Sequence, residues 1–266
     1  MNDGMHLELY RRFTEARPEF DTVGKIMPYE WTKLPDPLEA IWMAYSFMLD
    51  DFARELANAM NGFTLNVRRL CTWESLMASL DEKEQAEALH EFIEPIVTLC
   101  LLTPYMIKSR LLFATAHLCH QVNLQREAGW PEGLLPVDDA IWMGSADQQG
   151  APWRRYTRLK TRIEAIGGNK LRKATADFRN AFTHRFSPRV GTGITNFVTR
   201  NLDPATGRVV YAFGGTDPLE LKDVSAQLVA ELAKGYAAFA ALQALVEDQE
   251  TYVAAENVAA RAVREK

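Results

Sequence analysis

The sequence has few cysteines and no long uncharged stretch. Its 266 residues include three cysteines, and no two of them form a Cys-x-x-Cys pair, so a disulfide framework is disfavoured and a reducing compartment fits best. The least charged stretch, residues 95–107, is well short of the roughly 20 apolar residues that span a bilayer. The first residues include early acidic side chains and lack the apolar segment of a signal peptide. We therefore expect a cytoplasmic protein with no membrane partner.

Common catalytic and ligand-binding motifs are also missing. The chain has no Gly-x-Ser-x-Gly turn, no P-loop and no His-Glu-x-x-His helix, so it gives no sign of the chemistries that depend on them.

His117 and His120 share a helical face and could ligate a metal. Their apolar surroundings, without a nearby carboxylate, favour buried structural histidines instead. We expect no metal and no cofactor.

What the chain does have is a basic segment hidden by an acidic total. The chain carries 30 Lys and Arg against 35 Asp and Glu, a formal net charge of −5. Residues 1–150 sum to −11 and residues 201–266 to −4, whereas residues 151–200 sum to +10. Such a segment could contact the phosphates of a nucleic acid, or it could be a solvated face that pairs with acidic residues of this chain or of a second copy. The expected nucleic-acid-binding residues are Arg172, Lys173, Arg185, Arg189, Arg154, Arg155 and Arg158.

Proline positions and helix-start signals outline the fold. Four prolines crowd residues 1–37, which predicts an extended arm with at most a short helix. Two Asp-Pro-Leu-Glu sequences, at 36–39 and 217–220, combine an N-cap aspartate, a proline at the first helical position and a glutamate suited to a capping box. They predict helices from 37 to about 61 and from 218 to about 250.

Other segments complete the predicted fold. Residues 81–126 have a helical pattern, as do residues 153–185 with an interruption at Gly167-Gly168. Two β-rich runs on either side of Asn201–Gly207 predict a small β-hairpin near residues 194–214. Few, long helices usually pack as a bundle. The sequence thus predicts an all-α helical bundle with one hairpin, as a single α-helical domain over 1–266 whose helical body spans 38–266.

The basic segment contains one constellation suited to phosphodiester chemistry, Arg179-Asn180-x-x-x-His184. Asn180 and His184 are four residues apart and share a helical face, so the amide could orient the imidazole. A guanidinium can bind a phosphate in bidentate fashion, and imidazole exchanges protons near neutral pH. Arg179 and His184 could therefore catalyse metal-free RNA cleavage, in which the imidazole activates the 2′-OH or protonates the leaving oxygen.

Residues 179–184 resemble the Arg-x4–6-His signature of HEPN domains (higher eukaryotes and prokaryotes nucleotide-binding), in which a polar residue typically follows the arginine. The position near the end of a predicted long helix is similar as well, and the resemblance covers roughly residues 100–250. It implies a HEPN-like helical core that commonly dimerises and so brings two Arg/His pairs into one cleft. It also implies a metal-independent endoribonuclease of a toxin or defence type.

Two other interpretations stay open at this point. Some proteins of this family have lost catalysis and bind nucleotides or partners, so the chain could be a non-catalytic module that docks a nucleotide or an antitoxin-like protein. In the third interpretation the chain is a structural helical bundle without a site. There His184 caps carbonyls at the end of its helix and Arg179 pairs with a carboxylate. A minimal HEPN domain does not account for residues 1–80 or for the hairpin.

Overall fold

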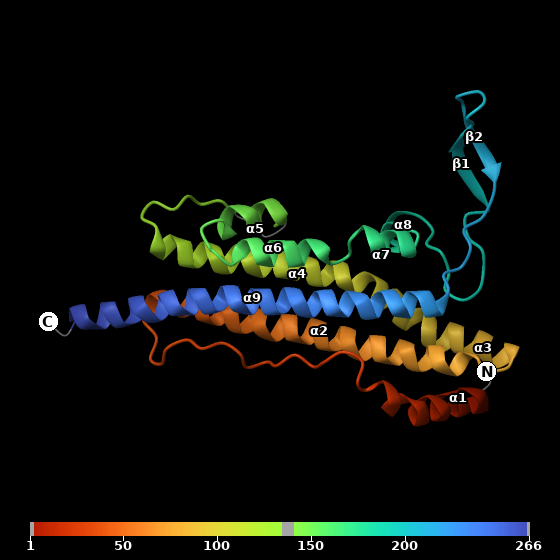
Figure 1. Ribbon diagram of the computed structural model, residues 1–266, viewed down its shortest axis with the longest axis horizontal. Coiled ribbons are helices and arrows are strands. Elements are labelled where there is room, and N and C mark those ends of the chain that lie inside the picture. Colours follow the sequence, from red (N-terminus) through yellow and green to blue (C-terminus); the bar gives the residue numbers. More distant parts are fainter. Residues whose placement is uncertain (1–2, 135–140, 265–266) are drawn as a thin grey trace. The chain divides into compact units, whose positions relative to one another are not determined.

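The protein is mostly helical, as the sequence predicts, with one two-stranded antiparallel sheet (Figure 1). The computed structural model describes residues 3–134 and 141–264. The helices are α1 (Asp3–Ala16), α2 (Met43–Met77), α3 (Glu82–Ala88), α4 (Glu94–Arg126), α5 (Met143–Gly150), α6 (Tyr156–Ala165), α7 (Asn169–Ala174), α8 (Phe178–His184) and α9 (Leu221–Arg264). The strands are β1 (Val198–Leu202) and β2 (Val209–Phe213), within the hairpin region that the sequence predicts.

The chain divides into two compact units, each built from segments far apart in the sequence. Unit 1 comprises Met1–Gly24, Thr64–Thr103 and Gly167–Ala230, and unit 2 comprises Lys25–Phe63, Pro104–Ile166 and Glu231–Lys266. The three long helices α2, α4 and α9 each contribute residues to both units. The candidate motif at residues 179–184 and the hairpin both belong to unit 1.

The first helix, α1, packs into an aromatic cluster of unit 1. The Phe13 ring stacks on Trp73 with ring centroids 5.0 Å apart, and Trp73 stacks on Phe92 at the same distance. The extended arm predicted for residues 1–37 therefore starts with a 14-residue helix. All of the prolines in this region follow α1, beginning with Pro18, so an amphipathic stretch is free to form a helix and to bury its apolar side.

The last part of the predicted arm, residues 25–37, contains neither helix nor strand and belongs to unit 2. Asn61 of α2 fixes part of this segment, because its side chain accepts a hydrogen bond from the Met27 N–H (2.6 Å) and donates one to the Met27 carbonyl (3.1 Å). The Trp31 ring packs against Phe239 with centroids 5.8 Å apart. Side chains of two long helices thus satisfy and cover an extended backbone.

Helix α2 begins six residues later than the sequence predicts. Asn257 of α9 accepts a hydrogen bond from the Glu39 N–H (2.7 Å) and donates one to the Pro37 carbonyl (3.1 Å). These bonds keep Glu39 extended, with ψ at 144°, so a 3₁₀ turn starts at Ala40 and α2 itself at Met43. The Asp-Pro-Leu-Glu sequence at 36–39 therefore precedes the helix instead of capping it.

Helix α9 also begins later than predicted, at Leu221. Leu219, two residues before the helix, forms an isolated parallel β-bridge with Val190. The Leu219 N–H donates to the Arg189 carbonyl (2.8 Å), and the Gly191 N–H donates to the Leu219 carbonyl (2.9 Å). A residue whose backbone pairs with another strand cannot enter the helix, so the start signal at 217–220 is displaced by three residues.

Unit 2 has buried polar groups that satisfy one another. The Tyr45 hydroxyl donates to Gln249 Oε1 (2.9 Å), and Gln249 Nε2 donates to Cys119 Sγ (3.3 Å). Burial raises the pKa of Tyr45 well above its ordinary value, and burial likewise raises the pKa of Cys119. Both side chains are therefore neutral in the folded protein near pH 7, as burial beside the uncharged Gln249 amide requires.

Helices α5 and α6 of unit 2 are joined by Asp147. Its carboxylate accepts hydrogen bonds from the Tyr156 hydroxyl (2.7 Å) and from Lys160 Nζ (2.9 Å). Partial burial raises the pKa of Asp147, but the hydrogen bonds from Lys160 and Tyr156 outweigh burial and hold it below its ordinary value. Gln149 of α5 meets α4, because Asn123 Nδ2 donates to its carbonyl (2.8 Å).

By length and composition alone, two helical stretches are apolar enough to cross a membrane: Glu82–Arg126 and Leu221–Val263. The least charged stretch, residues 95–107, predicts no such span because it is too short, and the two longer stretches include charged side chains. Within the protein, 44% and 50% of their most apolar windows are buried. The expected absence of a membrane partner stays a prediction.

Candidate nucleic-acid interface

The motif residues lie on α8, a helix of seven residues. The sequence predicts one helix through residues 169–185, but Ala176 and Asp177 have positive φ angles of 47° and 52° and separate α7 from α8. Left-handed conformations are costly for residues with a Cβ atom, so packing on either side must hold this break. The motif therefore does not end a long helix, which is a departure from the HEPN-like placement expected from the sequence.

One side of α8 is anchored and the other faces solvent. Phe178 and Ala181 are buried, and the Phe178 ring stacks on Phe182 with centroids 5.6 Å apart. Arg179 and His184 are exposed. With about 100° per residue, their side chains leave the helix about 140° apart, so the two groups flank the exposed side of α8 and do not point in one direction.

Asn180 is half-buried and lies about 40° around the helix from His184. Among the described residues, no hydrogen bond joins the Asn180 amide to the His184 ring. The orienting role predicted for Asn180 thus has no counterpart in this conformation. On the same helix, the Thr183 hydroxyl donates to the Arg179 carbonyl (2.8 Å), an ordinary local bond of a helical threonine.

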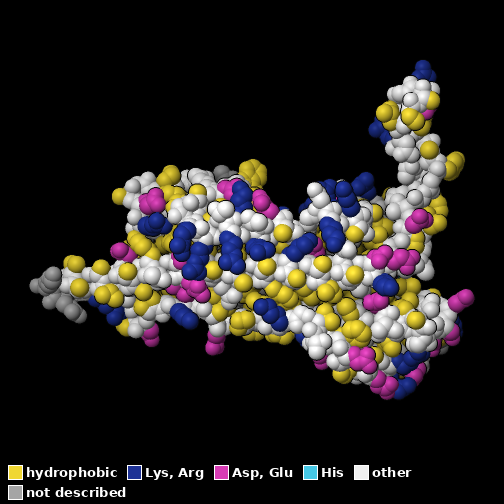
Figure 2. All heavy atoms as spheres, viewed as in Figure 1, with side chains coloured by type: hydrophobic (Ala, Val, Ile, Leu, Met, Phe, Trp, Pro, Cys, Tyr) yellow, Lys and Arg dark blue, Asp and Glu magenta, His cyan; other side chains and the backbone are white. Residues whose placement is uncertain are grey.

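The expected nucleic-acid-binding residues fall into both units. Arg172, Lys173, Arg185 and Arg189 belong to unit 1, and Arg154, Arg155 and Arg158 belong to unit 2. Figure 2 shows Lys and Arg side chains gathered over α7 and α8.

Some of these cations are neutralised by carboxylates. Arg155 contacts Glu247 (2.8 Å) and Asp248 (3.1 Å), Arg172 contacts Asp177 (3.3 Å), and Arg189 contacts Glu94 (2.5 Å). Arg155 and Arg189 thus pair with acidic residues of this chain outside the basic segment, an alternative that the sequence left open, whereas Asp177 lies within the segment. Within the described parts of the chain, the members of the predicted set that make no ion pair are Arg154, Arg158, Lys173 and Arg185.

A pocket of about 500 Å³ lies beside α8 in unit 1, and we call it the hairpin pocket. Residues of α8, of the following segment and of β1 line it, among them Ala181, Arg185, Phe186, Arg200 and Asn201. None of its lining residues is acidic, and none of the three motif residues lines it. Arg200 is the last residue of the basic segment, but the sequence does not mark it as a binding residue, because the pattern around it predicts only a β-hairpin.

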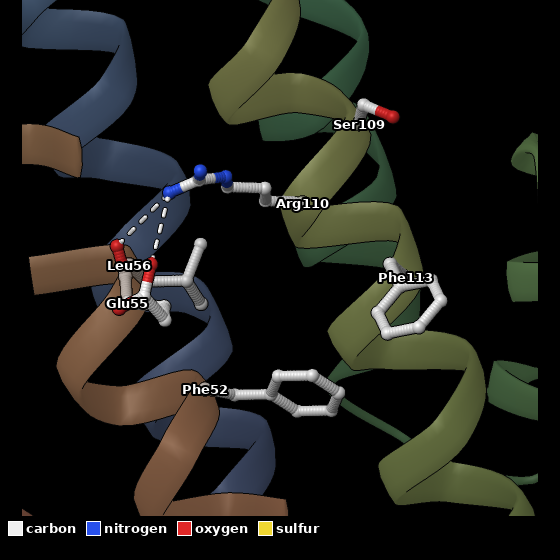
Figure 3. A pocket seen from close by; sticks show the side chains of 6 residues that line it. All are labelled: Phe52, Glu55, Leu56, Ser109, Arg110 and Phe113. Carbon is white, nitrogen blue, oxygen red and sulfur yellow. Dashed lines mark hydrogen bonds and ion pairs between the residues drawn. The ribbon is translucent and has the colours of Figure 1, made fainter.

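Unit 2 has a hollow of different character between α2 and α4 (Figure 3). Its volume is about 370 Å³. The rings of Phe52 and Phe113 point toward one another across it in an edge-to-face arrangement, with centroids 5.6 Å apart. Arg110 reaches across to Glu55, where Nη1 lies 3.4 Å from Oε2. Its lining is apolar apart from this ion pair and Ser109, so it offers no phosphate chemistry.

The two histidines considered as metal ligands are engaged otherwise. His117 packs against Phe113, with centroids 4.5 Å apart. The His120 ring lies within 3.1 Å of both Gln149 Oε1 and Glu132 Oε2. Among residues 3–134 and 141–264, no three His, Cys, Asp or Glu side chains form a group that could hold a metal ion.

Comparison of the chain with models of known protein families, with curated proteins and with solved structures found no match. The assignment of a function therefore depends on the residues and their geometry.

Proposed function

We propose that the protein is a metal-independent endoribonuclease of the HEPN type, acting in a toxin or defence system. The observation that carries the proposal is the placement of Arg179 and His184. Both are exposed and flank the solvent side of α8, in a region of unit 1 where basic side chains gather. An RNA strand lying across this helix would meet a guanidinium and an imidazole without any rearrangement of the core.

The chemistry that these two side chains support is internal transesterification. His184 takes the proton of a ribose 2′-OH, and the 2′-oxygen attacks the adjacent phosphorus as the bond to the 5′-oxygen breaks. Arg179 stabilises the negative charge that gathers on the phosphate oxygens. The 5′-oxygen takes a proton from water, or from a protonated His184 of a second copy, as it leaves, and the products are a 2′,3′-cyclic phosphate and a 5′-hydroxyl. No bound metal takes part in these steps.

A non-catalytic nucleotide-binding module is the second candidate, favoured by two observations. Arg179 and His184 point about 140° apart, and neither lines the hairpin pocket. In a single copy, a strand has to wrap across the exposed side of α8 for both groups to reach one phosphate. A protein that binds a nucleotide without cleaving it needs the cations and the pocket but no acid–base group.

We propose further that two copies of the chain associate through the hairpin. The register pairs Val198 with Phe213 and Leu202 with Val209, so these four apolar side chains share one face with Tyr211. Arg200 of β1 stands opposite Tyr211 on the same face. Each of the five apolar side chains is more than half exposed, Phe213 at 95%, and Figure 2 shows hydrophobic side chains on the hairpin. An isolated two-stranded hairpin is marginally stable.

A second copy is the occupant that fits this face best. The stretch Val209–Gly215 carries no charge, so two copies can meet along β2 without opposing like charges, and this arrangement leaves Arg200 of β1 outside the contact. The resemblance to HEPN domains implies a dimer as well. In such a dimer the second copy would supply another His184, which could protonate the leaving oxygen.

If this interface forms, the protein has twice the mass of one chain, and a charge placed in the interface separates the two copies. The wild-type protein should sediment at twice the 30.1 kDa mass of the chain, and Phe213→Asp should sediment as a single chain because it places a charge in the apolar face. Ala205→Asp, which adds the same charge in the hairpin turn, is the control and should remain dimeric. Sedimentation velocity measures all three; a monomeric wild-type protein or a dimeric Phe213→Asp variant contradicts this interface.

The proposed activity is tested by incubating the wild-type protein with a pool of random single-stranded RNA in buffer that contains EDTA. We expect cleavage, with products that carry 2′,3′-cyclic phosphate and 5′-hydroxyl ends, because the 2′-OH is the nucleophile. Binding without cleavage would support the second candidate. Cleavage that requires added Mg²⁺, or that leaves 5′-phosphate ends, would overturn the mechanism.

A further inference from the structure

The hairpin pocket concentrates positive charge that the protein does not neutralise. Its two arginines, Arg185 and Arg200, make no ion pair among the described residues, and no acidic residue lines the pocket. Elsewhere in unit 1, Arg172 and Arg189 each have a carboxylate partner. The contrast is informative, because unpaired arginines that face one concave surface are typical of sites for anionic ligands.

The exposed edge of β1 adds backbone groups to the same pocket. The Gly214 N–H donates to the Phe197 carbonyl (2.9 Å), which makes these two residues a hydrogen-bonded pair of the hairpin. In an antiparallel pair, bonded and non-bonded positions alternate. Val198 and Arg200 therefore occupy non-bonded positions, and their N–H and carbonyl groups point to the outer edge of β1. Both residues line the pocket, so main-chain donors face the same space as the arginines.

The remaining polar groups suit the recognition of a base. Asn196 uses its side-chain nitrogen within the protein, donating to the Phe186 carbonyl (3.2 Å) and to Thr216 Oγ1 (3.1 Å). Asn201 does the same toward Thr199 Oγ1 (2.9 Å). The Asn196 amide nitrogen is thus committed, the Asn201 nitrogen keeps one N–H, and both amide oxygens can accept hydrogen bonds from a base. The Phe186 ring is 76% exposed at the pocket and offers a surface for stacking.

From these features we propose that the hairpin pocket binds one nucleotide of an RNA strand, with Arg185 and Arg200 on its phosphate and Phe186 against its base. Its volume of about 500 Å³ lies within the range of about 300–1,000 Å³ for small-molecule sites. Arg185 directly follows His184 in the chain, so a nucleotide held here neighbours the proposed site of cleavage. This inference rests on the proposed function and specifies how its substrate is held.

The other ligand with suitable chemistry is an acidic peptide. An extended peptide could pair with the open edge of β1 and place its carboxylates near the arginines. The neutral amide oxygens and the exposed aromatic ring favour a nucleotide, because a peptide that pairs along the strand needs neither of them. The peptide is therefore an outcome to be distinguished in the experiment.

Binding is measured by fluorescence anisotropy with a labelled single-stranded oligonucleotide that is 2′-O-methylated throughout and so cannot be cleaved. We expect Arg200→Ala to bind at least tenfold more weakly than wild type, because a charge-assisted contact is lost. The slope of log affinity against log salt should fall by about 0.7 for each lost phosphate contact. Arg208→Ala is the matched control, since Arg208 is an exposed hairpin arginine that does not line the pocket, and it should bind within twofold of wild type.

The outcomes separate this inference from the proposed function. If oligonucleotide binding depends on Arg200 but the wild-type protein cleaves no RNA, the pocket is a nucleotide-binding site and the proposed nuclease activity is wrong. Equal binding by Arg200→Ala and wild type, in a protein that does cleave RNA, would refute the pocket alone. Binding of a labelled oligo-aspartate that Arg200→Ala abolishes and that excess oligonucleotide does not displace would also overturn the inference in favour of a peptide.

Discussion

Replacing His184 by alanine should lower the rate of metal-free RNA cleavage by at least 100-fold. A positioned imidazole contributes about 10²–10⁴-fold when it transfers a proton in the transition state, and alanine leaves no group on α8 that can replace it. His184 is exposed, so the substitution removes no buried packing and should leave the free energy of unfolding within about 0.5 kcal/mol of wild type. The rates are measured in EDTA with enzyme in excess over a labelled RNA.

A matched control for this variant is His90→Ala. His90 also belongs to unit 1, and its side chain is 77% exposed beside Glu91 and Glu94, on a different element from the motif. We expect this variant to cleave RNA at the wild-type rate. If His90→Ala and His184→Ala lose activity equally, or if neither loses activity, then α8 does not provide the acid–base group.

The second large effect concerns stability. Trp73→Ala should lower the free energy of unfolding by about 3–5 kcal/mol, the range measured for large aromatic residues in cores. The Trp73 side chain is almost fully buried between Phe13 and Phe92. Its removal takes a stacked ring from both neighbours, leaves Phe13 with Tyr10 as its stacking partner, and opens a cavity where α1 is held in unit 1.

Urea unfolding followed by circular dichroism measures this effect as a lower midpoint. Trp142→Ala is the control, because Trp142 is 67% exposed and its loss should change the free energy of unfolding by no more than about 0.5 kcal/mol. A Trp73→Ala variant as stable as the control would show that the aromatic cluster is not what holds α1.

The sequence predicts helices and the hairpin correctly where local signals suffice, and it fails where distant residues decide. The start of α2 is set by Asn257, which lies 218 residues beyond Glu39 in the chain, and no local pattern encodes that contact. The break between α7 and α8 falls at Ala176 and Asp177, neither of which is glycine or proline. Tertiary packing imposes a left-handed backbone there, against the helical preference of alanine.

The candidate site shows the same division. Charge and spacing are sufficient to find the motif at residues 179–184 and the basic segment around it. They do not reveal which cations are paired: Arg189 meets Glu94, which is 95 residues away in the chain, whereas Arg200 meets no carboxylate among the described residues. Net charge over a segment therefore locates a surface, but only the fold identifies the arginines left for a ligand.

The most direct measurement of the central claim compares the wild-type protein with the double variant Arg179→Ala/His184→Ala on one RNA under single-turnover conditions in EDTA. If the two side chains act as a unit, their losses do not add. The double variant should then cleave at least 100-fold more slowly than wild type and within a few fold of His184→Ala alone. Cleavage by the double variant at the wild-type rate would contradict the account, because the chemistry would then belong elsewhere in the chain.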